Sequence, residues 1–427
     1  MLRKAYYSIL VVLSLVGVWA TFTRLSEGLK VTGLTTYSTW GLWVVFYIFF
    51  IGLSAGSFLL STMVYVFNMK QFERIGKAAL LSAFFSLLAG MVFILIDLGH
   101  PARFWHTLIY RQANSVLSWE IQLYLVYLLL IVGELWLLLR EQLSRLANAA
   151  DGFKATLYKV LTLGYSVPSE EKVLEEHRAK AAKWLKVLGI IGIPTAIGVH
   201  GGTGSIFGVV AAKHYWNSGL TPIIFLVSAL VSGAALMLLV YAFMGPENGE
   251  KKSLLNQLGS LLILFISVDL LLVVSEFLVG LYSVIPDAKE PLLNIIAGPN
   301  WYIFWLGQIG LGAVIPIALL ANKNKTTYTS GLAGLFVVMG IVAVRWNLII
   351  PAYTTPHLEG LNNAYVDARL VYEYAPSTIE WLSSLGLIGL FVLAFSIACN
   401  LLPVFKNEEV ELNYDRQSQG LSTSIQA

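Results

Sequence analysis

The sequence predicts an all-α polytopic membrane protein with about ten transmembrane helices. Of its 427 residues, 57% are hydrophobic and only 12% are charged, and the mean hydropathy is +0.72. A soluble protein of this length carries about 25% charged residues. The apolar runs are long and continuous, which favours helices over the alternating strands of a barrel. This composition excludes an ordinary cytosolic enzyme and a disordered chain. The small net charge of +3, with basic residues in loops, argues against nucleic acid as a partner.

Each long apolar run predicts one helix. The runs lie at residues 5–23, 40–67, 78–98, 119–139, 184–208, 219–243, 256–284, 300–321, 329–350 and 379–404. The first run follows Arg3 and Lys4, as in a signal peptide, but it is about 18 residues long and ends in a poor cleavage site, which favours a membrane helix. The mixed charges of residues 141–183 predict a solvated amphipathic helix on the inner side.

The distribution of Lys and Arg predicts the orientation. With the N-terminus inside, the inner segments hold 19 of these residues and the outer loops hold 7. The positive-inside rule then places both termini on the inner, cytoplasmic side. We expect the chain to lie in the cytoplasmic membrane of a prokaryotic cell. Residues 141–183 supply much of the excess, and long loops count for less under this rule. The outer loops 99–118 and 351–378 are long, and rich in Pro, aromatic residues and His, as expected for a site or a docking surface.

The histidines and the cysteine argue against a redox centre in this chain. A b-type haem needs two axial ligands within the membrane, but only His200 lies well inside a predicted span. The others are His100, His106, His177, His214 and His357. None of these pairs within a span at the spacing of a metal site. A single cysteine, Cys399, excludes an intrachain disulfide, an iron–sulfur site and a c-type haem attachment. We therefore expect no haem, no iron–sulfur cluster and no metal here.

Several ionisable side chains fall at one depth near the outer side. Charged groups within a membrane are costly and are candidates for function. A quinone head group needs hydrogen-bond partners at both carbonyls, groups that exchange protons, and apolar walls. The candidate site contains Trp40, Asp97, Arg103, His106, Trp119, Glu120 and His200. Of these, we expect Asp97, Glu120 and His200 to take part in catalysis.

Simpler interpretations remain open for single members of this set. Asp97 and Arg103 could pair and cap the end of the third helix. His200 could be a packed histidine whose polar atoms are satisfied. Trp40 and Trp119 could belong to an aromatic belt at the membrane interface. Their convergence at one depth favours the joint functional interpretation.

Deeper acidic residues suggest a route for protons. Glu134 lies fourteen residues beyond Glu120 on the fourth helix, about 21 Å away along the axis. Asp269 and Glu276 lie on roughly one face of the seventh helix. Arg345 falls at the depth of Glu276, so a buried ion pair is the simpler interpretation for these two, whereas Asp269 has no evident partner. The predicted proton path consists of Glu134, Asp269 and Glu276.

At these residues the sequence resembles the NrfD/PsrC family of membrane subunits, in its ten-helix branch. That branch includes the membrane subunit of quinone-linked nickel–iron hydrogenase, the Dsr complex P subunit and the C subunit of alternative complex III. Four stretches carry the resemblance. The first is residues 39–43, followed by the glycine pattern 52–56, and the second is residues 97–105, followed by 118–120. The third is His200, followed by 204–207 and 221–222, and the fourth is residues 372–377, which lead to Glu380. The glycine patterns at 52–56 and 204–208 are in themselves most typical of close helix packing.

The resemblance implies two four-helix bundles flanked by the first and tenth helices. It implies a quinone site in the first bundle, near a face where an iron–sulfur, ferredoxin-like subunit docks, and no haem in this subunit. The chain then divides into residues 1–39, 40–210 with the quinone site, 211–350 with the second bundle, and 351–427. One departure is His100, where the family commonly has Arg, so a fixed charge there is in doubt.

The sequence therefore predicts the quinone-binding membrane subunit of a multisubunit respiratory oxidoreductase. It would exchange electrons between menaquinone or ubiquinone, as substrate, and an iron–sulfur partner on the outer face, with further catalytic or cytochrome subunits. Arg103 and His106 would hold the loop over the pocket, and proton translocation is an open extension. Two alternatives are an ion-translocating, transporter-like protein and a passive membrane anchor.

Overall fold

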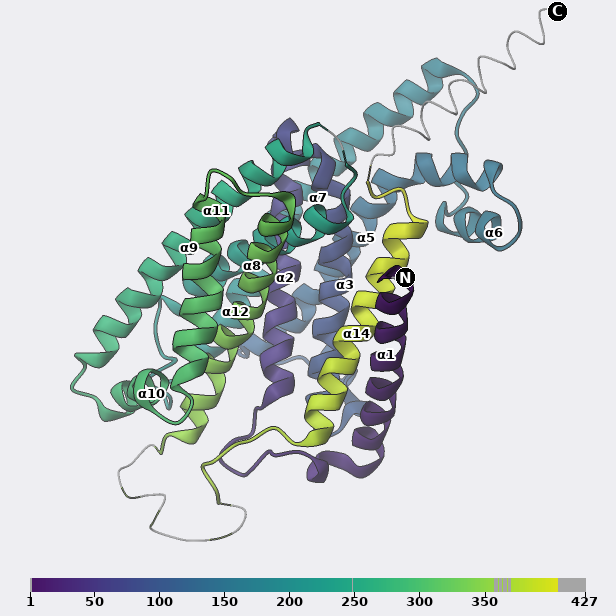
Figure 1. Ribbon diagram of the computed structural model, residues 1–427. Coiled ribbons are helices and arrows are strands. Elements are labelled where there is room, and N and C mark those ends of the chain that lie inside the picture. Colours follow the sequence, from purple (N-terminus) through teal and green to yellow (C-terminus); the bar gives the residue numbers. More distant parts are fainter. Residues whose placement is uncertain are drawn as a thin grey trace, which may run out of the picture.

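The computed structural model describes residues 2–247, 249–356, 360, 363, 367 and 370–405, and it is a bundle of long, roughly parallel and antiparallel helices (Figure 1). None of the described residues lies in a strand. Ten helices are long and apolar enough to cross a membrane. The predicted all-α membrane fold with ten spans is confirmed. His357 lies outside the described residues.

The membrane helices begin and end close to the predicted positions. They are α1 (Leu2–Glu27), α2 (Leu42–Tyr65), α3 (Glu73–Asp97), α5 (Val116–Ala149), α7 (Glu171–Gly208), α8 (Thr221–Met244), α9 (Lys251–Leu281), η4 (Ile303–Val314) continued by α11 (Ile315–Ala321), α12 (Thr327–Thr354) and α14 (Thr378–Leu401). Shorter elements join them: η1 (Gly28–Val31), η2 (Lys70–Phe72), η3 (Pro101–Arg103), α4 (His106–Ile109), α6 (Gly152–Leu161) and α10 (Pro286–Ala297).

The segment 141–183 differs from the single amphipathic helix that its charges suggested. Helix α5 continues to Ala149 and α7 already begins at Glu171, so both project beyond the bundle (Figure 1). Helix α6 lies in the segment that connects them and packs against α5. Glu141 accepts from Arg178 at 2.6 Å and from Arg145 at 3.0 Å, which joins the projecting ends of α5 and α7. Most of the charged side chains therefore extend two membrane helices, and Lys154 and Lys159 lie on the separate helix α6.

Helix α2 is the central helix of the bundle. In its most apolar stretch 94% of the residues are buried, and the helix packs against α3, α7, α8 and α12. At Gly56 a Cβ atom would lie 1.8 Å from the carbonyl oxygen of Ala229, so only glycine lets the backbones of α2 and α8 approach this closely. Gly204 on α7 packs in the same way against Pro222. The small-residue patterns thus serve helix packing at these two positions.

Helices α1 and α14 pack side by side at the edge of the bundle (Figure 1). Their backbones meet at Gly17 and Gly386, where a Cβ atom on either glycine would overlap the other. We call the end of the bundle that carries residues 28–41, 98–115, 209–220 and 282–302 the site face, and the opposite end the termini face. The site face is the lower end in Figure 1.

Candidate functional site

Glu120 is buried one turn into α5, where three helices bring hydroxyl groups to its carboxylate. Tyr47 of α2 donates to Oε2 at 3.0 Å, and Thr203 of α7 donates to Oε1. Tyr124, one turn further along α5, shares a 2.5 Å hydrogen bond with Tyr47. Both carboxylate oxygens therefore have partners, as a buried polar group requires.

His200 lies on α7, less than one turn before Thr203, and its ring is fully buried. Nε2 lies 3.4 Å from Nη2 of Arg345 on α12, whereas Nδ1 has no hydrogen-bond partner. Because Arg345 can only donate, Nε2 acts as the acceptor in this contact and the ring proton belongs on Nδ1. Gly52 of α2 makes room for the ring, since a Cβ atom there would lie 3.1 Å from Cε1. His200 thus presents a buried N–H group without an acceptor.

Arg345 is a buried guanidinium at the junction of α7, α8 and α12. It donates to the hydroxyl of Ser228 at 2.9 Å and lies 4.8 Å from the centroid of the Phe225 ring. Its charge also acts on Asp269 of α9. It makes no ion pair with Glu276 among the described residues, so the pair suggested by their common depth does not form.

Asp97 is the last residue of α3, and its Oδ1 atom is buried without a hydrogen-bond partner. The nearest cationic charge acting on it is Arg24 of α1, which uses its own N–H groups on the carbonyls of Ile96 at 2.8 Å and Leu98 at 2.6 Å. Arg103 is exposed in η3 and does not pair with Asp97. The capping pair that the sequence left open is therefore absent, and Asp97 keeps an unused acceptor.

A row of aromatic rings connects the surroundings of His200 with those of Asp97. The ring centroids are 5.3 Å apart for His200–Phe225, 5.7 Å for Phe225–Phe207, 5.7 Å for Phe207–Trp40 and 6.1 Å for Trp40–Tyr353. The charge of Asp97 acts on Tyr353, so the carboxylate lies in the neighbourhood of this end of the row. We call Phe225, Phe207, Trp40 and Tyr353 the aromatic row. It is a line of packed aromatic rings, of which Phe207 and Phe225 are buried, between two unsatisfied polar atoms.

The loop between α7 and α8 fastens to α12 next to this row. The indole N–H of Trp216 donates to the Leu348 carbonyl at 2.7 Å, and Lys213 Nζ donates to the Ala352 carbonyl at 2.5 Å. Burial lowers the pKa of Lys213, and the nearby Asp287 partly opposes this. The loop is therefore held by side chains that reach backbone acceptors.

The segment 370–377, which carries part of the family resemblance, fixes the start of α2. The hydroxyl of Tyr374 donates to Glu380 Oε1 at 2.5 Å and accepts from the backbone N–H of Leu42 at 2.8 Å. Glu380 Oε2 accepts from the backbone N–H groups of Gly33 at 2.7 Å and Ser377 at 2.8 Å. Burial and the adjacent carboxylate raise the pKa of Tyr374, so this hydroxyl stays protonated and keeps donating.

The remaining predicted site residues lie towards the surface of the site face. Trp119 is 55% exposed and donates its indole N–H to the Ala113 carbonyl at 2.7 Å, as a residue of an aromatic belt would. His106 is half-buried, 4.0 Å from the ring of Trp105. The structure thus brings Glu120 and His200 together beside Thr203, with the aromatic row leading from His200 towards Asp97. It leaves Arg103, His106 and Trp119 outside this group.

The deep acidic residues occupy two separate regions. Glu134 is buried on α5, and its Oε1 atom has no hydrogen-bond partner. Asp269 of α9 likewise has an unpartnered Oδ1. Glu276 lies two turns further along α9, about 10 Å along the helix axis. Among the described residues, none of these three carboxylates is hydrogen-bonded to Glu120 or to its hydroxyl partners.

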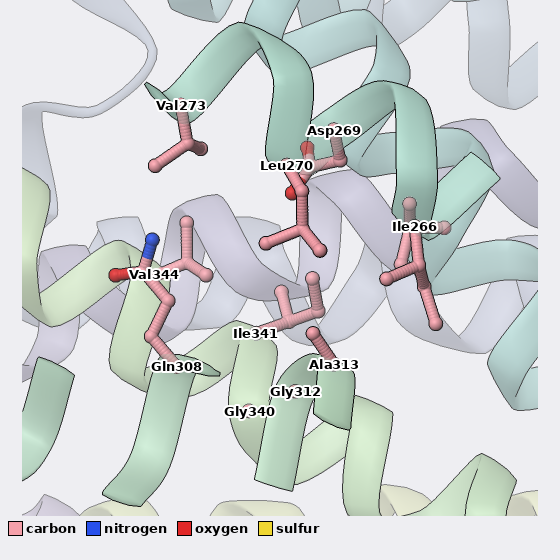
Figure 2. A pocket seen from close by; sticks show the side chains of 11 residues that line it. Ile266, Asp269, Leu270, Val273, Gln308, Gly312, Ala313, Gly340, Ile341 and Val344 are labelled. Carbon is pink, nitrogen blue, oxygen red and sulfur yellow. The ribbon is translucent and has the colours of Figure 1, made fainter. Parts of the chain in front are cut away.

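Asp269 lines a small cavity between α9, η4 and α12 (Figure 2). Its volume is about 20 Å³, which is enough for about one water molecule. Gln308 and Gly312 of η4 and Gly340 of α12 form the opposite wall. The η4 segment is π-helical, a form often found at functional positions within longer helices.

Sequence reasoning missed the hydroxyl partners of the site. Tyr47 and Ser228 lie inside apolar runs with no local signal that marks them. Tyr124 lies one helical turn from Glu120, and Thr203 lies about one turn from His200. This spacing was the only hint in the sequence that they belong to the site. Among the residues that the structure describes, no group of three or more His, Cys, Asp or Glu residues could hold a metal ion.

Comparison with known proteins places this chain in a family. The family model described as "Polysulphide reductase, NrfD" matches residues 30–357. The chain is 59% identical over 417 residues to the C subunit of the selenate reductase of Mesobacillus selenatarsenatis, covering 97% of this chain and 98% of that one. It is 27% identical over 422 residues to the Hdr-like menaquinol oxidoreductase integral membrane subunit of Archaeoglobus fulgidus, covering 95% of each. It is 26% identical over 328 residues to the C subunit of the polysulfide reductase of Wolinella succinogenes, covering 74% of this chain and 94% of that one. The chain therefore belongs to the NrfD family and is an integral membrane protein.

Proposed function

We propose that this chain is the quinone-reactive membrane subunit of a multisubunit reductase complex. The observation that carries the proposal is the pair of buried, unsatisfied polar atoms, His200 Nδ1 and Asp97 Oδ1, near opposite ends of the aromatic row. Buried polar atoms are nearly always hydrogen-bonded, so each orphan favours a partner that binds there. The names of relatives in two other organisms, which include menaquinol and reductase, agree with a quinone as that partner.

The chemistry of a quinone head group fits these residues. The Nδ1–H of His200 can donate to one quinone oxygen, and the carboxylate of Asp97 can accept from a quinol hydroxyl at the other. The aromatic row supplies apolar side chains beside the ring. Oxidation of a quinol releases two electrons and two protons. The electrons leave to the partner subunit, Asp97 takes up one proton, and the carboxylate of Glu120, which Thr203 holds next to His200, takes up the other.

We infer the direction of electron flow from the name of the relative that is 59% identical. That relative is named as a subunit of a selenate reductase, and a reductase of a soluble acceptor requires electrons. We therefore infer quinol oxidation in this chain and electron transfer to an iron–sulfur partner on the site face. The partner, or a further subunit, would carry the site that reduces an oxyanion of the selenate class.

Protons would leave the site through the deeper acidic residues. Arg345 contacts His200 and its charge also acts on Asp269, so a change of charge at Glu120, beside His200, can be felt at Asp269 through one guanidinium. The cavity beside Asp269 could hold the water that continues such a path. We propose Asp269 and Glu276 for this path, and Glu134 for a second route along α5.

The test uses the complex purified with its partner subunits. We expect Asp97→Asn and His200→Gln to lower quinol-dependent turnover by about 100-fold, the usual contribution of a positioned acid or base. Reduced viologen, which gives electrons directly to the partner, should support the same turnover in both variants as in the original complex. Unchanged quinol turnover and quinol affinity in both variants would refute the site, and loss of viologen activity would show that the complex itself was damaged.

A second candidate function is ion translocation without a redox partner, and the Asp269 cavity is the observation that favours it. The two functions differ in what accompanies the chain. A chain that purifies alone and moves ions in vesicles would support the transporter, whereas co-purification with an iron–sulfur subunit and bound quinone supports the reductase. Co-purification with an iron–sulfur subunit and bound quinone would also argue against a passive membrane anchor.

We also propose the orientation and the division into bundles that the sequence suggested. Both termini would lie in the cytoplasm, and the site face would lie outside the cytoplasmic membrane. Helices α2, α3, α5 and α7 would form the first bundle, and α8, α9, η4–α11 and α12 the second. A reporter enzyme that is active only outside the membrane, fused after Ala427, should stay inactive; activity would reverse the orientation.

A further inference from the structure

A second pocket lies at the termini face, between α5 and α7, far from the site described above. Its volume is about 260 Å³. The residues that carry its chemistry are Leu137, Arg140, Tyr165, His177, Lys180 and Trp184. No carboxylate of the described residues lines it, so the pocket combines cationic and aromatic groups.

The guanidinium of Arg140 is held in place at this pocket. It lies 4.5 Å from the ring centroid of Tyr165 and 5.1 Å from that of Trp136, and its Nη2 donates to the His177 carbonyl at 3.3 Å. Neither Arg140 nor Lys180 forms an ion pair with another described residue. The contacts of Arg140 with the two rings and with the His177 carbonyl use only one of its N–H groups. Its other N–H groups can therefore donate to an anion.

The nearest paired carboxylate does not neutralise the pocket. Glu141 follows Arg140 in the chain, but its oxygens accept from Arg178 at 2.6 Å and from Arg145 at 3.0 Å. Those two arginines already balance its charge. The side chain of His177 adds Nδ1, which is buried without a partner. The pocket is therefore a preformed site for a negatively charged, hydrogen-bond-accepting group.

The depth of the pocket matches a lipid headgroup. Trp184 lies 24 residues before the end of α7 at Gly208, about 36 Å along the helix, and Arg140 lies 21 residues after Trp119 on α5, about 32 Å. The hydrocarbon core of a bilayer is about 30 Å thick. The pocket thus lies at the membrane border opposite the site face, where phosphate groups of one leaflet are found.

Lipid-facing surface leads directly to the pocket from both helices. On α5, Val132, Trp136 and Arg140 follow one another at intervals of four residues and so share a face, and Val132 is exposed. On α7, Trp184 and Ile191 are seven residues apart on one face, and both are exposed. Acyl chains can therefore lie along these stripes while the phosphate occupies the pocket, an arrangement that a free phosphate ion would not need.

We propose that this pocket binds the phosphodiester headgroup of an anionic phospholipid. Arg140 and Lys180 contact the phosphate, His177 hydrogen-bonds to the headgroup, and Trp184 and Leu137 contact the start of the acyl chains. Basic pockets between membrane helices hold anionic lipids in this way. The bound lipid would fasten the projecting ends of α5 and α7 to the membrane. This proposal does not depend on the proposed quinone chemistry.

The experiment measures lipid preference with the full chain in its complex, placed in nanodiscs of phosphatidylcholine with a minor share of phosphatidylglycerol. We expect phosphatidylglycerol to be retained over phosphatidylcholine on extraction and in native mass spectrometry. Removing each charge should lower that preference roughly fivefold, so Arg140→Gln with Lys180→Gln should lower it about 25-fold. Lys180→Gln alone changes an exposed side chain and tests the site if the double variant does not fold.

The matched control is Lys172→Gln with Lys183→Gln, two exposed lysines of α7 outside the pocket. It removes the same charge and should keep the lipid preference. An equal loss in the control would reduce the effect to general surface charge and overturn the site. Displacement of the lipid by millimolar inorganic phosphate would assign the pocket to a soluble anion instead. A large gain in lipid binding on removal of residues 406–427 would assign it to the acidic tail of the chain.

Discussion

Glu120 and Asp269 are both carboxylates within membrane helices, but their surroundings differ. Glu120 accepts hydrogen bonds at both oxygens, from Tyr47 and Thr203 on two neighbouring helices. Asp269 has an unpartnered Oδ1 and lies beside a cavity of about 20 Å³. The first carboxylate is fixed by neutral donors, whereas the second has room for water and is balanced by the charge of Arg345.

The helices around these residues explain the difference. Glu120 lies on α5, but one of its hydroxyl partners comes from α2, where 94% of the residues in the most apolar stretch are buried. Asp269 lies on α9, where only 17% of the corresponding residues are buried. A carboxylate that faces a central helix meets side chains of several neighbours, whereas one on a peripheral helix beside a π-helical segment lies next to a gap. An acid in the first setting is therefore suited to positioning, and one in the second setting to exchanging protons.

The largest effect is expected at Arg345, the residue that connects the two regions. Arg345→Met should lower the free energy of unfolding by about 3–5 kcal/mol, because the negative charge of Asp269 would stay buried without compensation. Arg345→Lys keeps the charge and should recover much of this loss. The measurement is thermal or denaturant-induced unfolding in detergent. Equal stability of the Met variant and the original protein would show that Arg345 does not balance Asp269.

A smaller effect should separate the two helices by their packing. Gly56→Ala on α2 should cost about 1–3 kcal/mol, since its Cβ would meet the backbone of α8, which cannot yield without moving a helix. Gly259→Ala on α9 is the matched change, because its Cβ would lie 3.1 Å from the end of the flexible Leu320 side chain. At Gly259 the helix propensity of alanine, which exceeds that of glycine by about 1 kcal/mol, should offset the crowding. Similar losses in both variants would contradict the contrast between a central and a peripheral helix.

The smallest effect on stability, with the clearest effect on function, is expected from the carboxylates themselves. Glu120→Gln should cost about 1–2 kcal/mol because charge-assisted hydrogen bonds from Tyr47 and Thr203 become neutral ones. Asp269→Asn leaves the buried guanidinium of Arg345 without its compensating charge, but Arg345 keeps its hydrogen bond to Ser228 and its contact with the Phe225 ring, so we expect a loss of about 1–2 kcal/mol. Asp269→Asn should also lower the number of protons moved per quinol oxidised, measured with a pH dye in vesicles. An unchanged proton ratio would remove Asp269 from the proposed path.

The sequence by itself determined the ten helices and the depth of their polar residues. Both follow from the chain alone, because a run of about 20 apolar residues spans the hydrocarbon core and each residue advances 1.5 Å along the axis. Glu120 and His200 were placed near one end of the bundle on this basis, and the structure puts both on the part of α5 and α7 that Thr203 joins. The glycine pattern at 52–56 likewise indicated the close contact that Gly56 makes with α8.

Only the tertiary structure decided which way each side chain points and what it meets. Trp119 and Glu120 are adjacent and share a depth, yet a rotation of about 100° per residue leaves the first exposed and the second buried. Arg345 and Glu276 also share a depth, but Arg345 faces His200 and Ser228 instead. Rotation about a helix axis depends on the packing of all neighbouring helices, and a run of apolar residues on every face carries no signal for it.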